Sequence, residues 1–271
     1  MSFTRDIADY PEGIVLAVDK PYRWTSADVI RKIKYAAIRH FGKRNLKVGH
    51  AGTLDPLATG VLLVCIGNAC KRAQELQDHD KEYIARIRFG ATTPSYDLEK
   101  EVDRRFPYGH ISADAVRTAL PAFLGQQEQV APLFSAKSID GVRAYEMARK
   151  LYRAGKTDAI DAAALETLHR SRITIHELEL LDFAPGKPEE GTGVSSGSAS
   201  SRIHVADTSA LGLPEATVRI CCSKGTYIRA FARDLGEALG SGAHLAGLIR
   251  SRSGDYSIGQ AISVEEALAL L

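Results

Sequence analysis

The sequence predicts an α+β protein built on a mixed β-sheet. Predicted strands outnumber predicted helices, they do not alternate regularly with them, and no internal repeat is visible. Regular alternation would instead favour a doubly wound parallel sheet. With 271 residues, 45% hydrophobic and 25% charged, the chain has an ordinary soluble composition and is long enough to bury a full core.

Short apolar or alternating runs bounded by turn residues predict the strands. These runs cover residues 13–19, 61–66, 81–90, 171–183, 217–222 and 250–257. An extended segment over 129–141 contains Asp140-Gly141, a dipeptide typical of a hairpin turn.

Apolar residues at helical spacing after capping residues predict the helices. Thr25 followed by Asp28 marks the start of the first helix, and Ser112 marks the start of another. The predicted helices cover residues 26–40, 68–77, 112–124, 145–154, 226–239 and 264–271.

We expect a single catalytic domain over residues 1–271. Pro185, Pro188 and the run GTGVSSGSASS predict a mobile loop over about 184–213.

The stretch from Gly49 to Gly67, GHAGTLDPLATGVLLVCIG, holds four glycines, one proline and one acid, Asp55, directly before an apolar run. Glycine permits backbone angles that other residues resist, and Pro56 biases Asp55 towards an extended conformation. The stretch therefore predicts a tight loop that sets one carboxylate against a buried strand. Local sequence leaves a second interpretation open, a surface turn in which Asp55 bonds nearby backbone.

The surrounding sequence narrows the chemistry open to Asp55. His50 is five residues away, but no HxxxH or DxD pattern accompanies it, which makes a metal site improbable. The nucleophile elbow GxSxG of serine hydrolases is absent. Asp55 is then a candidate lone nucleophile or general base.

Three further groups point to an anionic partner. Residues 31–47 carry seven Lys or Arg and no acid, which indicates a phosphate-binding patch or a solvated helix face. In the segment SKGTYIR, Tyr227 could stack on a base and Arg229 could pair with a carboxylate or phosphate; the alternative is a core tyrosine and a solvated arginine. Residues 240–252 add glycines and two arginines. Together they fit RNA better than a small metabolite.

The four cysteines form no CxxC pair, which disfavours a zinc site or a disulfide framework. Cys65 lies in an apolar run and is expected to be a small buried residue. The chain shows no signal peptide and no run of membrane-spanning length, so we expect a cytoplasmic protein.

The sequence resembles the TruB family of tRNA pseudouridine synthases over most of its length. The segment GHAGTLDPLATG at 49–60 resembles the family's catalytic loop and is the most specific match. Further resembling segments are Asp19-Lys20-Pro21 with Thr25-Ser26, Lys81-Glu82-Tyr83, Ser135-Ala136-Lys137 with Gly141 and Tyr145-Glu146, SKGTYIR at 223–229, and Gly242-Ala243-His244.

The resemblance implies a role for each matched residue. Asp55 would be the catalytic aspartate, Tyr83 would lie against the flipped uracil, and Arg229 would pair with Asp55 and keep it ionised. The substrate-binding residues would be His50 in the space left by the flipped base, Tyr227 and Leu248 lining the pocket, and Lys20. We add Lys43 and Arg44 from the basic cluster as phosphate contacts.

The family also implies a fold and an activity. The fold would be a mixed, mainly antiparallel sheet flanked by helices and loops, with a central active-site cleft and an insert over about 125–160 that grips the T-loop. The enzyme would act as a monomer, isomerise the T-loop uridine at tRNA position 55, and need no metal or other cofactor, protein partner or membrane. Alternatives are a tRNA-folding chaperone, which could coexist with catalysis, and a synthase acting on another RNA.

Two departures from the family pattern concern affinity more than catalysis. Residues 255–271 are too few for the carboxy-terminal PUA domain that bacterial relatives often carry, so we expect fewer contacts on the acceptor side of tRNA. The loop over 184–213 is longer than the usual connection.

Overall fold

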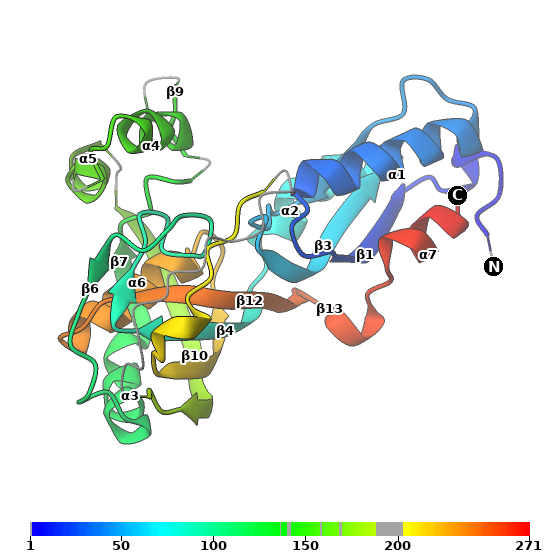
Figure 1. Cartoon of the computed structure of the whole chain (residues 1–271). Helices are drawn as coiled ribbons and strands as arrows, with labels where there is room; N and C mark the ends of the chain where they lie inside the picture. The colour runs from blue at the N-terminus through cyan, green and yellow to red at the C-terminus, as the bar shows by residue number, and fades with distance from the viewer. Residues whose placement is uncertain (1, 136, 140–141, 158, 168–169, 188–202) are drawn as a thin grey trace. The chain divides into compact units, whose positions relative to one another are not determined.

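A computed structural model describes residues 2–135, 137–139, 142–157, 159–167, 170–187 and 203–271 (Figure 1). The chain forms two compact units, one of Met1–Ile84 with Leu248–Leu271 and one of Ala85–Gly247. Strands β4 (Lys81–Phe89) and β12 (Ala243–Ser253) contribute residues to both. The single domain expected over residues 1–271 stays a prediction.

The sheet of the first unit is mixed, as predicted. Strand β3 (Ala58–Ile66) pairs antiparallel with β1 (Ile14–Lys20) and with β2 (Val48–Ala51). It pairs parallel with β12 at residues 248–250, and β13 (Tyr256–Ser257) pairs antiparallel with the end of β12. Parallel and antiparallel pairings in one sheet confirm that the sheet is mixed.

Helix α1 (Ser26–Phe41) packs its apolar stripe into the core of this unit. A reciprocal capping box between Thr25 and Asp28 starts the helix, as the sequence predicted. Val29, Ile33 and Ala37 are fully buried in one cluster with residues of β1 and β3. The other helices of the unit are η1 (Ile7–Asp9), η2 (Gly67–Arg72), α2 (Ala73–Asp78), η5 (Ile258–Gln260) and α7 (Val264–Ala269).

In the second unit, strands β12, β4, β11 (Glu215–Cys222), β10 (Ser171–Ala184) and β7 (Gly125–Gln129) follow one another in this order. The helical elements are α3 (Ala113–Ala119), η3 (Leu120–Phe123), α4 (Ala144–Arg153), α5 (Ala159–Thr167), η4 (Ser209–Leu211) and α6 (Ile228–Ala238). Short two-stranded pairs join β5 (Ala91–Thr92) to β6 (Arg104–Arg105) and β8 (Ser138–Ile139) to β9 (Val142–Arg143). The second pair confirms the predicted hairpin, although Asp140 and Gly141 themselves lie outside the described residues.

The predicted insert has a core of its own. Phe134, Ala148 and Ile160 belong to one buried cluster that links the segment after β7 with α4 and α5. The sequence predicted α4 but not α5. The sequence of α5, rich in alanine with scattered polar residues, shows little helical periodicity. This helix therefore becomes recognisable only in the fold, where it packs against α4.

Strand β12 begins at Ala243, seven residues earlier than predicted. Ala243, His244 and Leu245 are all buried, so exposed and buried positions do not alternate at the start of this strand. The strand predicted over 250–257 therefore began too late and missed residues 243–249.

The loop expected over 184–213 is only partly described. Residues 188–202 lie outside the described residues. Residues 206–211 are packed, because Ala206, Thr208 and Leu211 are buried and the Ala206 amide donates to the Leu98 carbonyl oxygen at 2.7 Å. This end of the predicted loop is therefore anchored in the second unit. Among the described residues, no helix has both the length and the apolar character needed to cross a membrane.

The His244 ring is buried in the second unit and contacts two polar partners there. Its Nδ1 lies 2.9 Å from the Ala91 carbonyl oxygen and its Nε2 lies 3.3 Å from Thr208 Oγ1. A carbonyl only accepts, so Nδ1 carries the hydrogen and Nε2 accepts from Thr208, whose oxygen accepts from Arg88 at 2.8 Å. Burial lowers the pKa of His244 to about 4, so the ring is neutral at pH 7.

We expect His244 to make the protein sensitive to mild acid. The unfolded chain binds a proton at this residue near pH 6.5, whereas the folded chain binds it only near pH 4. The free energy of unfolding should therefore fall by up to about 3 kcal/mol as the pH drops through this window. Urea unfolding at pH 7 and pH 5 should show a smaller fall in His244→Asn than in the parent. The control is His110→Gln on the surface, and an equal fall in all three proteins would contradict the assignment.

Candidate active site

The loop between β2 and β3 presents Asp55 at the surface of the first unit. Ser26, in the first turn of α1, holds the preceding residue from both sides: its hydroxyl accepts from the Leu54 amide at 2.9 Å and donates to the Leu54 carbonyl at 3.1 Å. The Leu54 side chain is buried in the core. The Asp55 carbonyl accepts from the Ala58 amide at 3.1 Å, where β3 begins. Asp55, half-buried between these anchors, has a fixed backbone.

Lys20 also holds this loop through hydrogen bonds to backbone carbonyl groups. Its ammonium donates to the carbonyl oxygens of Trp24 at 2.7 Å, Pro21 at 3.1 Å and Pro56 at 3.4 Å. Burial lowers the pKa of Lys20 to about 8, and the nearby charge of Asp55 opposes that shift. The side chain is fully buried. The family resemblance predicted that Lys20 contacts the substrate, but its side chain has no exposed surface for such a contact. Its hydrogen bonds favour a role in supporting the loop beside Asp55.

Arg250, on β12, holds the start of the loop and was missed by the sequence analysis as a site residue. Its guanidinium donates to the carbonyl oxygens of Val61 at 2.7 Å, Gly52 at 3.1 Å and Thr53 at 3.4 Å. Gly60 has a φ of 98°, and a side chain there would collide with the Arg250 backbone. The signal in the sequence was an arginine inside a strand opposite a glycine.

His50 lies on β2, close to this arginine. Its ring is partly buried, and both burial and the charge of Arg250 lower the pKa of His50. Within the described part of the chain, its buried Nδ1 has no hydrogen-bond partner. A neutral ring with one unused nitrogen suits a residue that contacts a ligand, and it equally suits a residue that only fills space.

Tyr83 and Leu248 also belong to the first unit. Both are partly buried and pack against the core cluster that contains Leu54. The first unit therefore places an aromatic ring, an aliphatic side chain and the carboxylate loop around one core cluster.

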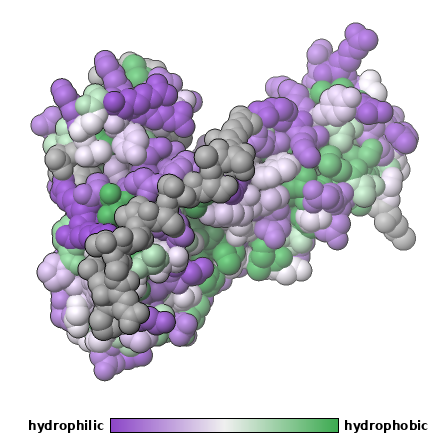
Figure 2. Space-filling model, in the orientation of Figure 1, coloured by the Kyte–Doolittle hydropathy of each residue, from purple (hydrophilic) through white to green (hydrophobic). Residues whose placement is uncertain are grey.

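Lys43 and Arg44, the two cations taken from the basic cluster, are exposed. Helix α1 ends at Phe41 and Gly42 adopts the left-handed conformation at its carboxyl end, so the two cations follow in the turn. Lys43 lines one shallow surface groove of about 540 Å³, and Arg44 lines another of about 490 Å³. Lys47 lines both grooves. Hydrophilic residues cover much of α1 in Figure 2. This surface offers positive charge to a polyanion.

Arg229 is held inside the second unit by residues of the segment after β5. Its Nη1 donates to the Ser95 carbonyl at 3.2 Å, and its Nε lies 3.8 Å from Asp97 Oδ2. Both side chains of the ion pair are buried. The alternative of a solvated arginine was therefore wrong.

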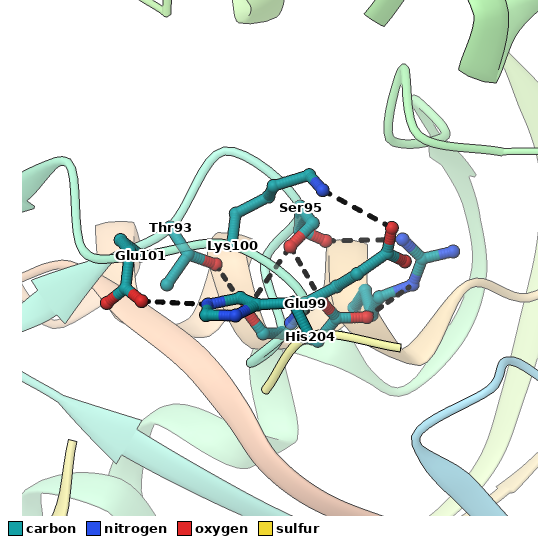
Figure 3. Close-up of polar contacts among 8 residues, drawn as sticks. Thr93, Ser95, Glu99, Lys100, Glu101 and His204 are labelled. Carbon is teal, nitrogen blue, oxygen red and sulfur yellow. Dashed lines mark hydrogen bonds and ion pairs between the residues drawn. The ribbon is translucent and has the colours of Figure 1, made fainter. Parts of the chain in front are cut away.

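Asp97 is the second residue that the sequence analysis missed. It accepts from the Ser95 hydroxyl at 2.6 Å and from the Glu99 amide at 2.9 Å, and the Thr93 hydroxyl donates to its carbonyl. Figure 3 shows this group of polar residues with the Lys100–Glu99 and His204–Glu101 pairs beside it. An acid in a polar, turn-rich segment was the only sequence signal for it.

Tyr227 caps the amino end of α6 and connects it to the insert. Its amide donates to Gln129 Oε1 at 2.8 Å, and Gln129 Nε2 donates back to its carbonyl at 3.1 Å. The ring packs against the core cluster of the insert.

Within the described residues, no group of three or more His, Cys, Asp or Glu is arranged to hold a metal ion.

The fold is similar to that of chains in solved Cbf5 complexes. A chain of the crystal structure of a Cbf5-Nop10-Gar1 complex matches with a TM-score of 0.61 and 23% identity, covering 99% of this chain and 58% of that one. A chain of the archaeal box H/ACA sRNP Nop10-Cbf5 complex matches with a TM-score of 0.57 and 21% identity, covering 97% and 55%. This chain thus spans a little over half of those chains, and the likeness concerns the fold.

Sequence comparison identifies the class of protein as a pseudouridine synthase. Residues 39–198 match the amino-terminal domain model of the TruB family pseudouridylate synthases. The chain is 47% identical to tRNA pseudouridine synthase B of Phocaeicola vulgatus, over 95% of this chain and 92% of the relative. It is 42% identical to tRNA pseudouridine synthase B of Flavobacterium johnsoniae, over 96% and 98%. The chain belongs to the TruB family.

Proposed function

We propose that this TruB-family enzyme converts the T-loop uridine at tRNA position 55 to pseudouridine, with Asp55 as its catalytic group. Family membership and relatives named tRNA pseudouridine synthase B support the activity. The observation that carries the site is the loop of residues 52–57. Ser26, Lys20 and Arg250 hold its backbone, and Asp55 is only partly buried.

The reaction breaks the bond from C1′ to N1, forms a bond from C1′ to C5, and moves the C5 proton to N1. The base must leave the T-loop stack, which costs a few kcal/mol. Stacking on Tyr83 offsets part of that cost, His50 takes the vacated space, and Leu248 and Tyr227 line the pocket. A lone carboxylate can serve by attack on the base, by attack on the sugar, or by removal of the 2′ proton.

Arg229 completes the proposed site by pairing with Asp55. Asp97 and the Ser95 carbonyl hold the guanidinium within the second unit, so it meets an anion without further reorganisation. In this proposal the enzyme acts as a monomer in the cytoplasm and uses no metal or redox cofactor.

The substrate is tested by mapping pseudouridine in total RNA by chemical probing. A strain that lacks this protein should lose the modification at tRNA position 55, and a plasmid copy should restore it. Loss at an rRNA position or another RNA position instead would favour a synthase with a different target. An unchanged map would contradict the proposed function.

Lys43 and Arg44 are expected to contact tRNA phosphates. Replacing both by Ala should weaken tRNA binding, and the dependence of log Kd on log salt should become shallower by about 0.9 for each lost contact with duplex RNA phosphate. The measurement is a series of binding titrations between low and physiological salt.

The matched control removes two cations that are already paired. Arg117 and Arg219 each form ion pairs with acids of their own unit. Changing both to Ala therefore also removes two positive charges, but from positions where acids already neutralise them. A salt slope equal to the parent's in the Lys43→Ala/Arg44→Ala protein would reject the contact.

A further inference from the structure

Helix α6 carries two arginines one helical turn apart, Arg229 and Arg233, which therefore lie on the same face. Together they hold three consecutive residues of another segment. Arg229 contacts Ser95 and Asp97, as described above. The guanidinium carbon of Arg233 lies 5.3 Å from the ring centroid of Tyr96, the residue between them. This distance is that of a cation–π contact.

Tyr96 has an unusual backbone. Its φ is 57°, in the left-handed region that bulky residues avoid. Its amide donates to the Thr93 carbonyl at 3.0 Å, and its carbonyl accepts from the Leu245 amide at 2.9 Å. The ring is buried. With Tyr96 in this conformation, the residues on both sides of it reach Arg229, so the turn decides where Asp97 lies.

Arg233 is itself held in place from two sides. Its Nε donates to Asp234 Oδ1 at 2.7 Å, and its Nη2 donates to the Val130 carbonyl at 3.2 Å. Val130 directly follows β7 and lies near the start of the insert. The guanidinium is thus fixed by its own helix and by the root of the insert, and a fixed guanidinium can hold the Tyr96 ring in turn.

We infer that Arg233 and Tyr96 are positioning residues for catalysis: their stacking holds the left-handed turn at Tyr96 and, through it, keeps Asp97 against Arg229. The catalytic part of this inference rests on the proposed function, because Arg229 acts there on Asp55. The structural part, that Tyr96 and Arg233 immobilise Arg229, stands on the contacts within the second unit.

Kinetics separate a positioning role from a general loss of structure. Tyr96→Leu removes the ring and Arg233→Gln removes the cation, so each should lower kcat about tenfold while KM for tRNA stays within about twofold. Tyr96→Phe keeps the ring but removes the hydroxyl that accepts a hydrogen bond from Arg233, so it should lower kcat less than Tyr96→Leu does. Arg219→Gln, which removes a peripheral arginine on β11, is the matched control. Thermal unfolding identifies any variant that loses its fold, and Arg233→Lys then replaces Arg233→Gln as the milder test.

A double variant shows whether the pair acts through Asp97. In the Asp97→Asn background, Tyr96→Leu should lower kcat by less than about twofold further, because the contact that it supports is already gone. Parent-like kcat in both Tyr96→Leu and Arg233→Gln would overturn the inference. So would effects of Tyr96→Leu and Asp97→Asn that multiply.

A measurement without substrate distinguishes failure of this inference from failure of the proposed function. Hydrogen exchange of the Arg229 side-chain Nε–H, followed by 15N NMR, should be slow in the parent and faster in Tyr96→Leu and Arg233→Gln. Equal exchange in parent and variants would overturn the inference even in an active enzyme. Faster exchange in the variants supports it even if the parent forms no pseudouridine.

Discussion

Asp55→Asn is expected to abolish pseudouridine formation, with a fall in rate of at least about a thousandfold. Asparagine keeps the size of the side chain and a hydrogen-bond acceptor, but it can serve neither as a nucleophile nor as a base in this reaction. The loop should keep its shape, because Ser26, Lys20 and Arg250 bind its backbone. The dissociation constant for tRNA should stay within about threefold. The rate is measured under single-turnover conditions with a T-loop transcript.

The control for this change is Asp114→Asn, which neutralises an exposed carboxylate on α3 of the second unit. It should leave both rate and affinity at the parent's values. Parent-like activity in Asp55→Asn would remove the aspartate from the mechanism and with it the core of the proposed function.

The same variant separates catalysis from the chaperone alternative. If base flipping loosens the contact between the T-loop and D-loop, Asp55→Asn protein should still accelerate the folding of unmodified tRNA. Equal folding rates with and without this protein would argue against a chaperone role.

The second large effect is expected at the buried pair of Arg229 and Asp97. Arg229→Met and Asp97→Asn should each lower kcat by at least about a hundredfold, because each leaves the catalytic cation absent or misplaced. Each should also lower the free energy of unfolding by about 3 kcal/mol, since removing one partner breaks a buried ion pair.

The double variant tells these two effects apart. Arg229→Met with Asp97→Asn removes both charges, so its loss of stability should be smaller than the sum of the single losses by about 1 kcal/mol or more. Its activity should stay as low as that of Arg229→Met. Arg219→Met breaks a partly exposed ion-pair group instead and should cost less than about 1 kcal/mol. Additive stability losses would show that the two buried charges do not interact.

Much of the local structure could be predicted because its causes are local. The capping box at Thr25 and the spacing of Val29, Ile33 and Ala37 lie within one helix, and both were read correctly. The apolar run of β3 was recognised for the same reason. Strand β12 was misjudged at its start because burial on both faces removes the alternation on which such a prediction depends.

The sequence by itself determined the family, the α+β class and Asp55 as the residue of interest, because the motif around it is specific and contiguous. Only the tertiary structure decided which residues hold that loop and the proposed catalytic arginine. Lys20 reaches Pro56 across 36 positions, and Arg250 reaches Gly52 across 198. Arg229 meets the Ser95 carbonyl across 134 positions. Burial in a folded core turns these distant polar groups into partners, since a buried charge is stable only where the fold supplies its hydrogen bonds.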